Sequence, residues 1–266
     1  MKFGCCVSMC GTAADPAGLR YLPAVVEAGF DYVELPIAEI MQLRDEEFEQ
    51  LLRQLSVLGI RCESCNNLFP ASVRLTGAAR DDEQIQNYLH RAMDRVQALG
   101  ARRVVFGSAS AKNVPAGYPM DAAWQQIAQE LLWISDAAQR VDPDIQIAIE
   151  PVCHRESNIL HTYAEGFDMA ETSRRSNVRC LVDYYHLSVE QEPLEDVLKG
   201  GTRLCHVHIS NPNGRIYPCA DDGQDYAGFF AALRHAGYDE RVSVEAYTEN
   251  FKEDAARALA CLRSLI

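Results

Sequence analysis

Four residues that could bind one metal ion lie at the ends of consecutive β-type segments in the second half of the chain. They are Glu150, Asp183, His208 and Glu245. If these segments are neighbouring parallel strands of a barrel, their carboxyl ends meet at one rim and the four side chains converge there. Carboxylates crowded together out of water are unfavourable unless a cation compensates them. The arrangement therefore predicts one divalent metal site.

The donor set is mostly oxygen with one imidazole nitrogen, which suits Mn²⁺, Mg²⁺ or Co²⁺ better than thiolate-rich structural zinc. We expect Mn²⁺, with Mg²⁺, Co²⁺ or Zn²⁺ as alternatives. Single residues have simpler explanations. Asp183 could cap the segment that follows it, and one of His206 and His208, which share a strand face, could be a core histidine. Their occurrence on four adjacent segments favours the shared site.

The segments that must position these residues alternate in type along the chain. Short apolar runs, typical of parallel strands buried on both faces, occur at 2–7, 32–35, 61–64, 103–106, 146–149, 179–182, 204–209 and 242–246. Helical patterns lie between or after them, at 15–28, 45–58, 81–99, 121–140, 164–176, 193–199, 225–236 and 252–265. This alternation predicts a single-domain (β/α)₈ TIM barrel of the α/β class over residues 1–266.

Punctuating residues support these boundaries. Glycines fall where four of the predicted helices would end, at Gly29, Gly59, Gly100 and Gly237. The pair Asp15-Pro16 is typical of an N-cap followed by proline in the first turn. A doubly wound dinucleotide-binding sheet is the alternative, but the Gly-x-Gly-x-x-Gly motif that it needs after the first strand is absent.

Composition excludes several classes of protein. The formal charge of −13 and the lack of a Lys/Arg block oppose a nucleic-acid partner. No apolar run reaches the roughly 18 residues of a membrane span, and the N-terminus has no cleavable signal pattern, so we expect a cytoplasmic protein without a membrane partner. The ten cysteines are then expected to be reduced. Cys62 and Cys65 are three apart on a predicted strand and should point to opposite faces.

Four motifs together resemble the sugar phosphate isomerase/epimerase superfamily, the xylose-isomerase-like barrels, and within it the ketose 3-epimerases. They are the Glu-Pro-Val-Cys-His-Arg-Glu-Ser-Asn stretch from Glu150, the Asp-Tyr-Tyr-His element from Asp183, the His-Val-His-Ile-Ser element from His206 with Arg215 downstream, and Val244-Glu245. The similarity extends over most of the chain and is sharpest between Ile147 and Ala246.

The resemblance implies specific roles. Glu150, Asp183, His208 and Glu245 would hold the metal, while Glu150 and Glu245 would also be the catalytic acid and base. Glu156, His186 and Arg215 would bind substrate oxygens. The implied substrate is a small sugar or sugar phosphate, a ketose that reacts through a cis-enediolate stabilised by the cation. Relatives are often dimers or tetramers, and the sequence itself leaves open the choice between a monomer, a homodimer and a homotetramer.

Alternative activities share this barrel. Aldose–ketose isomerisation needs the same kind of intermediate but only one base, and hydroxypyruvate-type isomerases and inosose isomerases or dehydratases have a similar ligand set. A non-catalytic sugar-binding barrel would not need both carboxylates. Apurinic endonucleases, which are phosphodiesterases with a three-metal cluster, have extra histidines after the earlier strands. Here those positions are Ser64-Cys65-Asn66-Asn67 and Gly107-Ser108-Ala109, without histidine.

Overall fold

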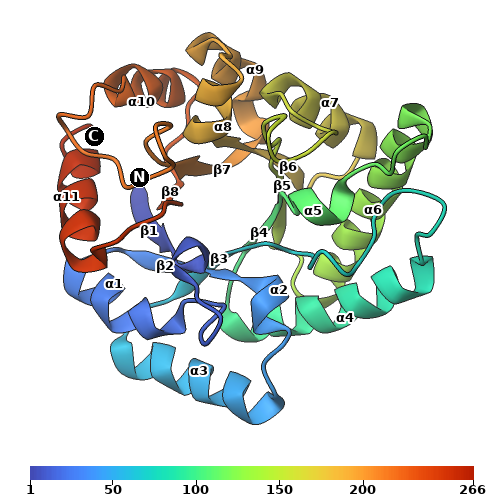
Figure 1. Ribbon diagram of the computed structural model, residues 1–266, viewed down its shortest axis with the longest axis horizontal. Helices are drawn as coiled ribbons and strands as arrows, with labels where there is room; N and C mark the ends of the chain where they lie inside the picture. Colours follow the sequence, from blue (N-terminus) through green and yellow to red (C-terminus); the bar gives the residue numbers. More distant parts are fainter.

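Eight parallel strands close into a barrel in chain order (Figure 1) in the computed structural model, which describes residues 1–266. The strands are β1 (Lys2–Cys6), β2 (Tyr32–Pro36), β3 (Cys62–Asn66), β4 (Arg103–Phe106), β5 (Gln146–Ile149), β6 (Val178–Asp183), β7 (Leu204–Ile209) and β8 (Arg241–Val244). Because all pairs are parallel, including the closing pair β1–β8, the strand carboxyl ends share one rim. The predicted barrel is confirmed.

Helices form a ring outside the barrel (Figure 1). The longer ones are α1 (Leu22–Ala28), α3 (Asp45–Leu58), α4 (Asp82–Leu99), α6 (Met120–Val141), α7 (Tyr163–Ser173), α10 (Tyr226–His235) and α11 (Phe251–Arg263). Shorter helices are α2 (Ile37–Ile40), α5 (Ala109–Lys112), α8 (Tyr184–Val189) and α9 (Val197–Gly200). Of these, α2, α5 and α8 come soon after β2, β4 and β6, so they lie at the carboxyl-end rim. None of the helices combines the length and apolar character needed to cross a membrane.

The hydrophobic core has two parts. A cluster of 72 buried residues joins the outward faces of the strands to the helices. A separate cluster contains Val105, Ala148, Leu181 and Cys205. The first two of these alternate along β4 and β5 with members of the large cluster, as expected for side chains that face the barrel interior. The small size of this interior cluster leaves room for polar side chains closer to the rim.

Helix ends follow the local sequence. Gly29, Gly59 and Gly100 end α1, α3 and α4 with positive φ angles of 90°, 67° and 79°, as predicted from their positions. Asp81 caps α4, because its side chain accepts a hydrogen bond from the backbone N–H of Gln84 at 2.9 Å.

The structure differs from the prediction for two helices and for the direction of one pair of cysteine side chains. The first helix begins at Leu22 rather than Asp15, because Gly18 has a left-handed conformation (φ 69°) that a helix cannot contain. The side chain of Asp15 instead accepts hydrogen bonds from the backbone N–H groups of Leu19 and Arg20. The predicted helix 193–199 is a 3-10 turn (Leu194–Asp196) followed by the four-residue α9.

Cys62 and Cys65 do not point to opposite faces, since their sulfur atoms are 3.9 Å apart. The pairing of β2 with β3 skips from Cys62 to Ser64, so an extra residue bulges from β3 between the two cysteines. A bulge of this kind shifts the alternation of side chains by one position. Both cysteines are free and buried.

We predict that Asp81→Ala lowers the free energy of unfolding by about 1 kcal/mol, because the α4 N-cap loses its acceptor. Asp121→Ala is the matched control, since Asp121 lies in the first turn of α6 without a capping hydrogen bond. It should cost only a few tenths of a kcal/mol. Urea denaturation of both variants measures the difference, and equal losses would contradict the assigned cap.

Candidate functional site

Four side chains from β5 to β8 meet at the rim formed by the strand carboxyl ends. Glu150, Asp183, His208 and Glu245 each offer one ligand atom, and these atoms all lie within 4.8 Å of one another. All four side chains are buried, with at most 6% of any residue exposed. The structure therefore brings together the four residues that the sequence singled out as metal ligands.

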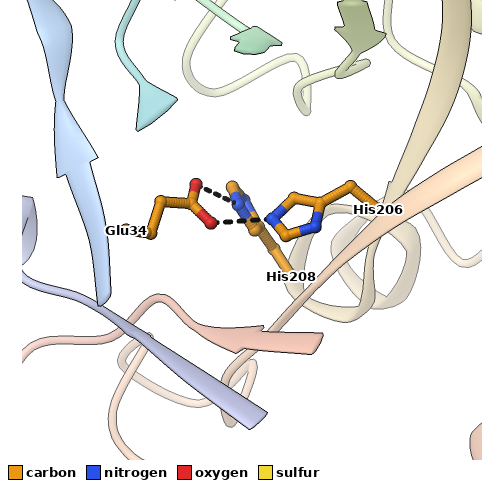
Figure 2. Close-up of side chains that lie close together, drawn as sticks. All are labelled: Glu34, His206 and His208. Atoms are coloured by element: carbon orange, nitrogen blue, oxygen red, sulfur yellow. Dashed lines mark hydrogen bonds and ion pairs between the residues drawn. The ribbon is translucent and has the colours of Figure 1, made fainter. Parts of the chain in front are cut away.

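His208 is the centre of this group. Its Nδ1 is 3.0 Å from Oε1 of Glu150 and 3.4 Å from Oε2 of Glu245. Its Nε2 lies on the other side of the ring, 2.8 Å from Oε1 of Glu34 (Figure 2). Burial opposes protonation of the imidazole, but the surrounding carboxylates, Glu34 first, outweigh it and raise the pKa of His208 well above its ordinary value.

Asp183 uses its two carboxylate oxygens differently. Oδ1 accepts a hydrogen bond from the backbone N–H of Tyr185 at 2.8 Å and so caps α8. The capping role considered for Asp183 from the sequence is therefore present. Oδ2 is buried and has no hydrogen-bond partner. Burial raises the pKa of the Asp183 carboxyl to about 7. A buried acceptor without a hydrogen bond is costly, so Oδ2 is well suited to coordinate a cation.

Glu150 and Glu245 flank His208 but differ in charge environment. Burial raises the pKa of Glu150 above its ordinary value, and the nearby Glu245 carboxylate adds to that rise. Burial also opposes ionisation of Glu245, but His208 and Arg215 outweigh it and hold the pKa of Glu245 well below its ordinary value. A pair of carboxyls pushed apart in this way suits one acid and one base.

Arg215 neutralises part of the acidic cluster. Its guanidinium is 2.5 Å from Oε2 of Glu245, 2.9 Å from Oε1 of Glu156 and 3.6 Å from Oδ2 of Asp183. It also stacks on the Tyr185 ring, with 4.7 Å between the guanidinium carbon and the ring centroid. Glu156 and Arg215 thus lie beside the four-residue group, and their role in binding substrate stays a prediction.

His186, the third predicted substrate residue, directs a hydrogen-bond donor toward the same place. Its Nδ1 accepts a hydrogen bond from the backbone N–H of Cys153 at 3.1 Å, so the ring proton is on Nε2. Burial, followed by the nearby Arg215, lowers the pKa of His186 well below its ordinary value, which keeps the ring neutral. Nε2 is 3.6 Å from Oδ2 of Asp183 and has no hydrogen-bond partner.

The donor set fits a divalent cation. Ligands about 2.1 Å from one ion are about 3.0 to 4.2 Å from each other, depending on whether they are adjacent or opposite. The distances from His208 Nδ1 to Glu150 and Glu245, 3.0 and 3.4 Å, lie in this range. The free Oδ2 of Asp183 supplies the fourth donor without breaking any hydrogen bond.

Several residues that support the site were not predicted as site residues from the sequence. Asn66, at the end of β3, donates a hydrogen bond to Oε1 of Glu245 at 2.8 Å. Gly107 follows β4, and a Cβ atom there would lie 2.1 Å from Oε2 of Glu150, so only glycine leaves room for this carboxylate. The ammonium of Lys112, fully buried, donates to the backbone carbonyl oxygen of Glu150 at 3.3 Å.

Glu34 was also missed, although it carried a visible signal. It is a charged residue inside the apolar run of β2, where a strand buried on both faces has little reason to place a carboxylate. Gly107 and Asn66 gave no comparable signal, because glycine and asparagine are common in loops after strands.

Comparison with known proteins places the chain among similar barrels. The family described as xylose isomerase-like TIM barrel matches residues 22–265. The chain is 28% identical over 257 residues to an L-ribulose 3-epimerase from Methylomonas sp. (strain DH-1), which covers 92% of this chain and 84% of that protein. It is 27% identical over 271 residues to a ketose 3-epimerase from Arthrobacter globiformis, covering 100% of this chain and 90% of that protein.

A solved structure supports the same fold. The crystal structure of a D-psicose 3-epimerase in the presence of D-fructose superposes with a TM-score of 0.87 at 21% identity, covering 100% of this chain and 99% of the other. At this identity the likeness concerns the fold. Because the family match extends over most of the sequence, the chain belongs to the xylose isomerase-like TIM barrel family.

Proposed function

We propose that this protein is a divalent-metal-dependent epimerase or isomerase of the isomerase class that acts on a ketose, free or phosphorylated. The observation that carries the proposal is that two carboxylates from different strands, Glu150 and Glu245, lie within 3.4 Å of one candidate ligand atom, Nδ1 of His208. The names of the similar proteins, an L-ribulose 3-epimerase and a ketose 3-epimerase, support the same substrate class.

Glu150, Asp183, His208 and Glu245 would hold the cation, and Mn²⁺ is the preferred ion because the donors are mostly oxygen. When bound, the ion supplies Lewis acidity to the oxygens of the sugar. The protein's own part is to keep these donors in place. Asn66 fixes Glu245 and the α8 cap fixes Asp183, so neither carboxylate needs to reorganise.

The two glutamates would move the proton. Epimerisation removes a proton from one face of the carbon next to the carbonyl and returns it on the other face, which requires two groups on opposite sides of the sugar. Glu150 follows β5 and Glu245 follows β8, so they approach the rim from different parts of the barrel. Removal of the proton leaves an enediolate of the sugar, the anion whose stabilisation is the main demand of the reaction.

Neutral and charged donors would orient the substrate. His186 offers an Nε2 proton that no protein group uses, and the guanidinium of Arg215 extends from Glu245 to Glu156. Sugar hydroxyls accept from such donors and can donate to the carboxylate of Glu156. These three residues would thereby set which carbon faces the two glutamates.

We predict that the Mn²⁺-loaded protein exchanges a carbon-bound proton of at least one ketose with D₂O. The experiment incubates three- to seven-carbon ketoses and their phosphates with metal-stripped and with Mn²⁺- or Co²⁺-reloaded protein and follows them by NMR. Deuterium at the epimerised carbon indicates epimerisation, and conversion into an aldose indicates isomerisation. Exchange by thoroughly metal-stripped protein would refute metal dependence. The absence of exchange with every sugar would refute the proposed activity and favour a non-catalytic sugar-binding protein.

We predict that Glu150→Gln and Glu245→Gln each lower kcat by at least about 10²-fold, because each removes one proton-transfer group. Glu130→Gln is the matched control, since Glu130 is a fully buried carboxylate in α6, outside the barrel, paired with Arg80. Metal content, circular dichroism and kcat are measured for all three variants. Near-normal turnover in either site variant would refute the role assigned to that glutamate.

We predict that Mn²⁺ binding weakens as the pH falls, most steeply below about 7, where the cation must displace a proton from Asp183 in addition to one from His208. The pKa of Asp183 is raised by burial to about 7 from its ordinary 3.8, so below pH 7 the metal-free protein holds a proton that the cation must displace. Displacing this proton should lower the Mn²⁺ affinity by up to about tenfold for each pH unit below 7. Calorimetric titration between pH 5.5 and 8.5 tests this, and an affinity independent of pH would contradict it.

A further inference from the structure

Glu34 is a fully buried carboxylate inside the barrel, on the far side of His208 from the candidate metal centre. Figure 2 shows its two oxygens facing two imidazole rings. Oε1 is 2.8 Å from Nε2 of His208, and Oε2 is 2.7 Å from Nε2 of His206. All three side chains are completely inaccessible to solvent. A carboxylate without water must be compensated by such contacts, so this arrangement is strongly constrained.

These contacts fix which nitrogen of His208 keeps its proton when the ring is neutral. An ionised carboxylate can only accept hydrogen bonds, so Nε2 of His208 must donate to Glu34. Nδ1, on the other side of the ring, then faces Glu150 and Glu245, and it offers its lone pair to a cation once its own proton has been displaced. Outer partners of this kind set the tautomer and the ring orientation of metal-binding histidines.

Glu34 is itself anchored by groups from two other strands. The hydroxyl of Ser243 in β8 donates to Oε2 at 2.6 Å, in addition to His206 of β7. Since that hydroxyl has one proton, Ser243 Oγ accepts from the hydroxyl of Tyr32, which lies at 2.8 Å. The network therefore joins β2, β7 and β8 across the barrel interior, below the rim.

Glu34, His206 and His208 could also be considered as ligands of a second ion. Adjacent ligands of one ion are about 3.0 Å apart or more when each bond is about 2.1 Å long. The two N–O distances here, 2.7 and 2.8 Å, are shorter and match charge-assisted hydrogen bonds. By contrast, the distances from His208 Nδ1 to the rim carboxylates suit ligands of one ion.

We infer that Glu34 is a positioning residue for the metal centre. It holds Nε2–H of His208 so that Nδ1 is presented to the cation, and Ser243 and His206 keep its carboxylate from turning. The inference rests on the proposed metal site, and it assigns Glu34 no contact with metal or substrate. Loss of this carboxylate should therefore weaken metal binding without removing any of the ligands.

The decisive variant is Glu34→Gln, which preserves the shape of the side chain but replaces one carboxylate oxygen by an NH₂ group. An amide facing His208 donates to Nε2 and forces the proton onto Nδ1, where it blocks the cation. An NH₂ group facing His206 instead leaves an oxygen on His208, but it forces His206 to place its proton on Nδ1, which has no hydrogen-bond partner. The orientation that presents His208 correctly to the cation therefore carries a cost of its own. We expect Mn²⁺ affinity, measured by calorimetry on metal-stripped protein without substrate, to fall about 10- to 100-fold.

Two controls make the result specific. Glu130→Gln, a fully buried carboxylate of α6 that lies outside this network, should keep wild-type Mn²⁺ affinity. In the Mg²⁺- or Zn²⁺-loaded wild type, two-bond ¹H–¹⁵N NMR spectra should show His208 protonated at Nε2. If Glu34→Gln does not fold, as judged by circular dichroism, Ser243→Ala replaces it, with an expected loss in affinity of about fivefold for one hydrogen bond.

The outcomes separate this inference from the proposed function. If wild-type protein binds no Mn²⁺, the metal site itself is wrong and the role of Glu34 falls with it. If the wild type binds Mn²⁺ and folded Glu34→Gln binds it within a factor of two, the metal site stands and the positioning role is refuted. A His208 ring protonated at Nδ1 in the metal-loaded wild type would refute it as well.

Discussion

Compensation of buried negative charge is the constraint on which the rim of this barrel depends. Glu150, Asp183 and Glu245 crowd around one imidazole, and Glu34 lies behind it, all removed from water. Carboxylates in such a position are tolerated only when cations or hydrogen-bond donors surround them. Arg215 meets part of this demand, and the free Oδ2 of Asp183 shows that part of it is unmet by the protein.

The two halves of the barrel contribute different residues to the site. The candidate ligands come from β5 to β8, whereas residues of β2, β3 and the loop after β4 support them from the opposite wall. Glu34 orients His208, Asn66 holds Glu245, and Gly107 leaves space for Glu150. A closed sheet makes this division natural, because side chains from opposite strands approach each other inside it. In an open sheet those walls would not face each other.

The barrel and the four candidate ligands could be predicted from the sequence because both follow from short-range patterns. Apolar runs mark the strands, and a polar residue at the end of a run marks the rim, as at Glu150. The supporting contacts could not be predicted, because they depend on distance across the interior. Glu34 and His208 are 174 positions apart in the chain. Likewise, the bulge in β3 that turns Cys62 toward Cys65 arises from pairing with β2, which local alternation does not encode.

The double use of Asp183 links two parts of the site that are separate in sequence motifs. One of its oxygens holds the first turn of α8, and that helix carries His186 three residues further on. The candidate metal ligand and the residue proposed to donate to the sugar therefore belong to one structural unit. A substitution at Asp183 that changes the ion preference would also shift His186, the proposed sugar-binding residue. Natural variation in the two properties is accordingly expected to be correlated across the family, rather than free to drift independently.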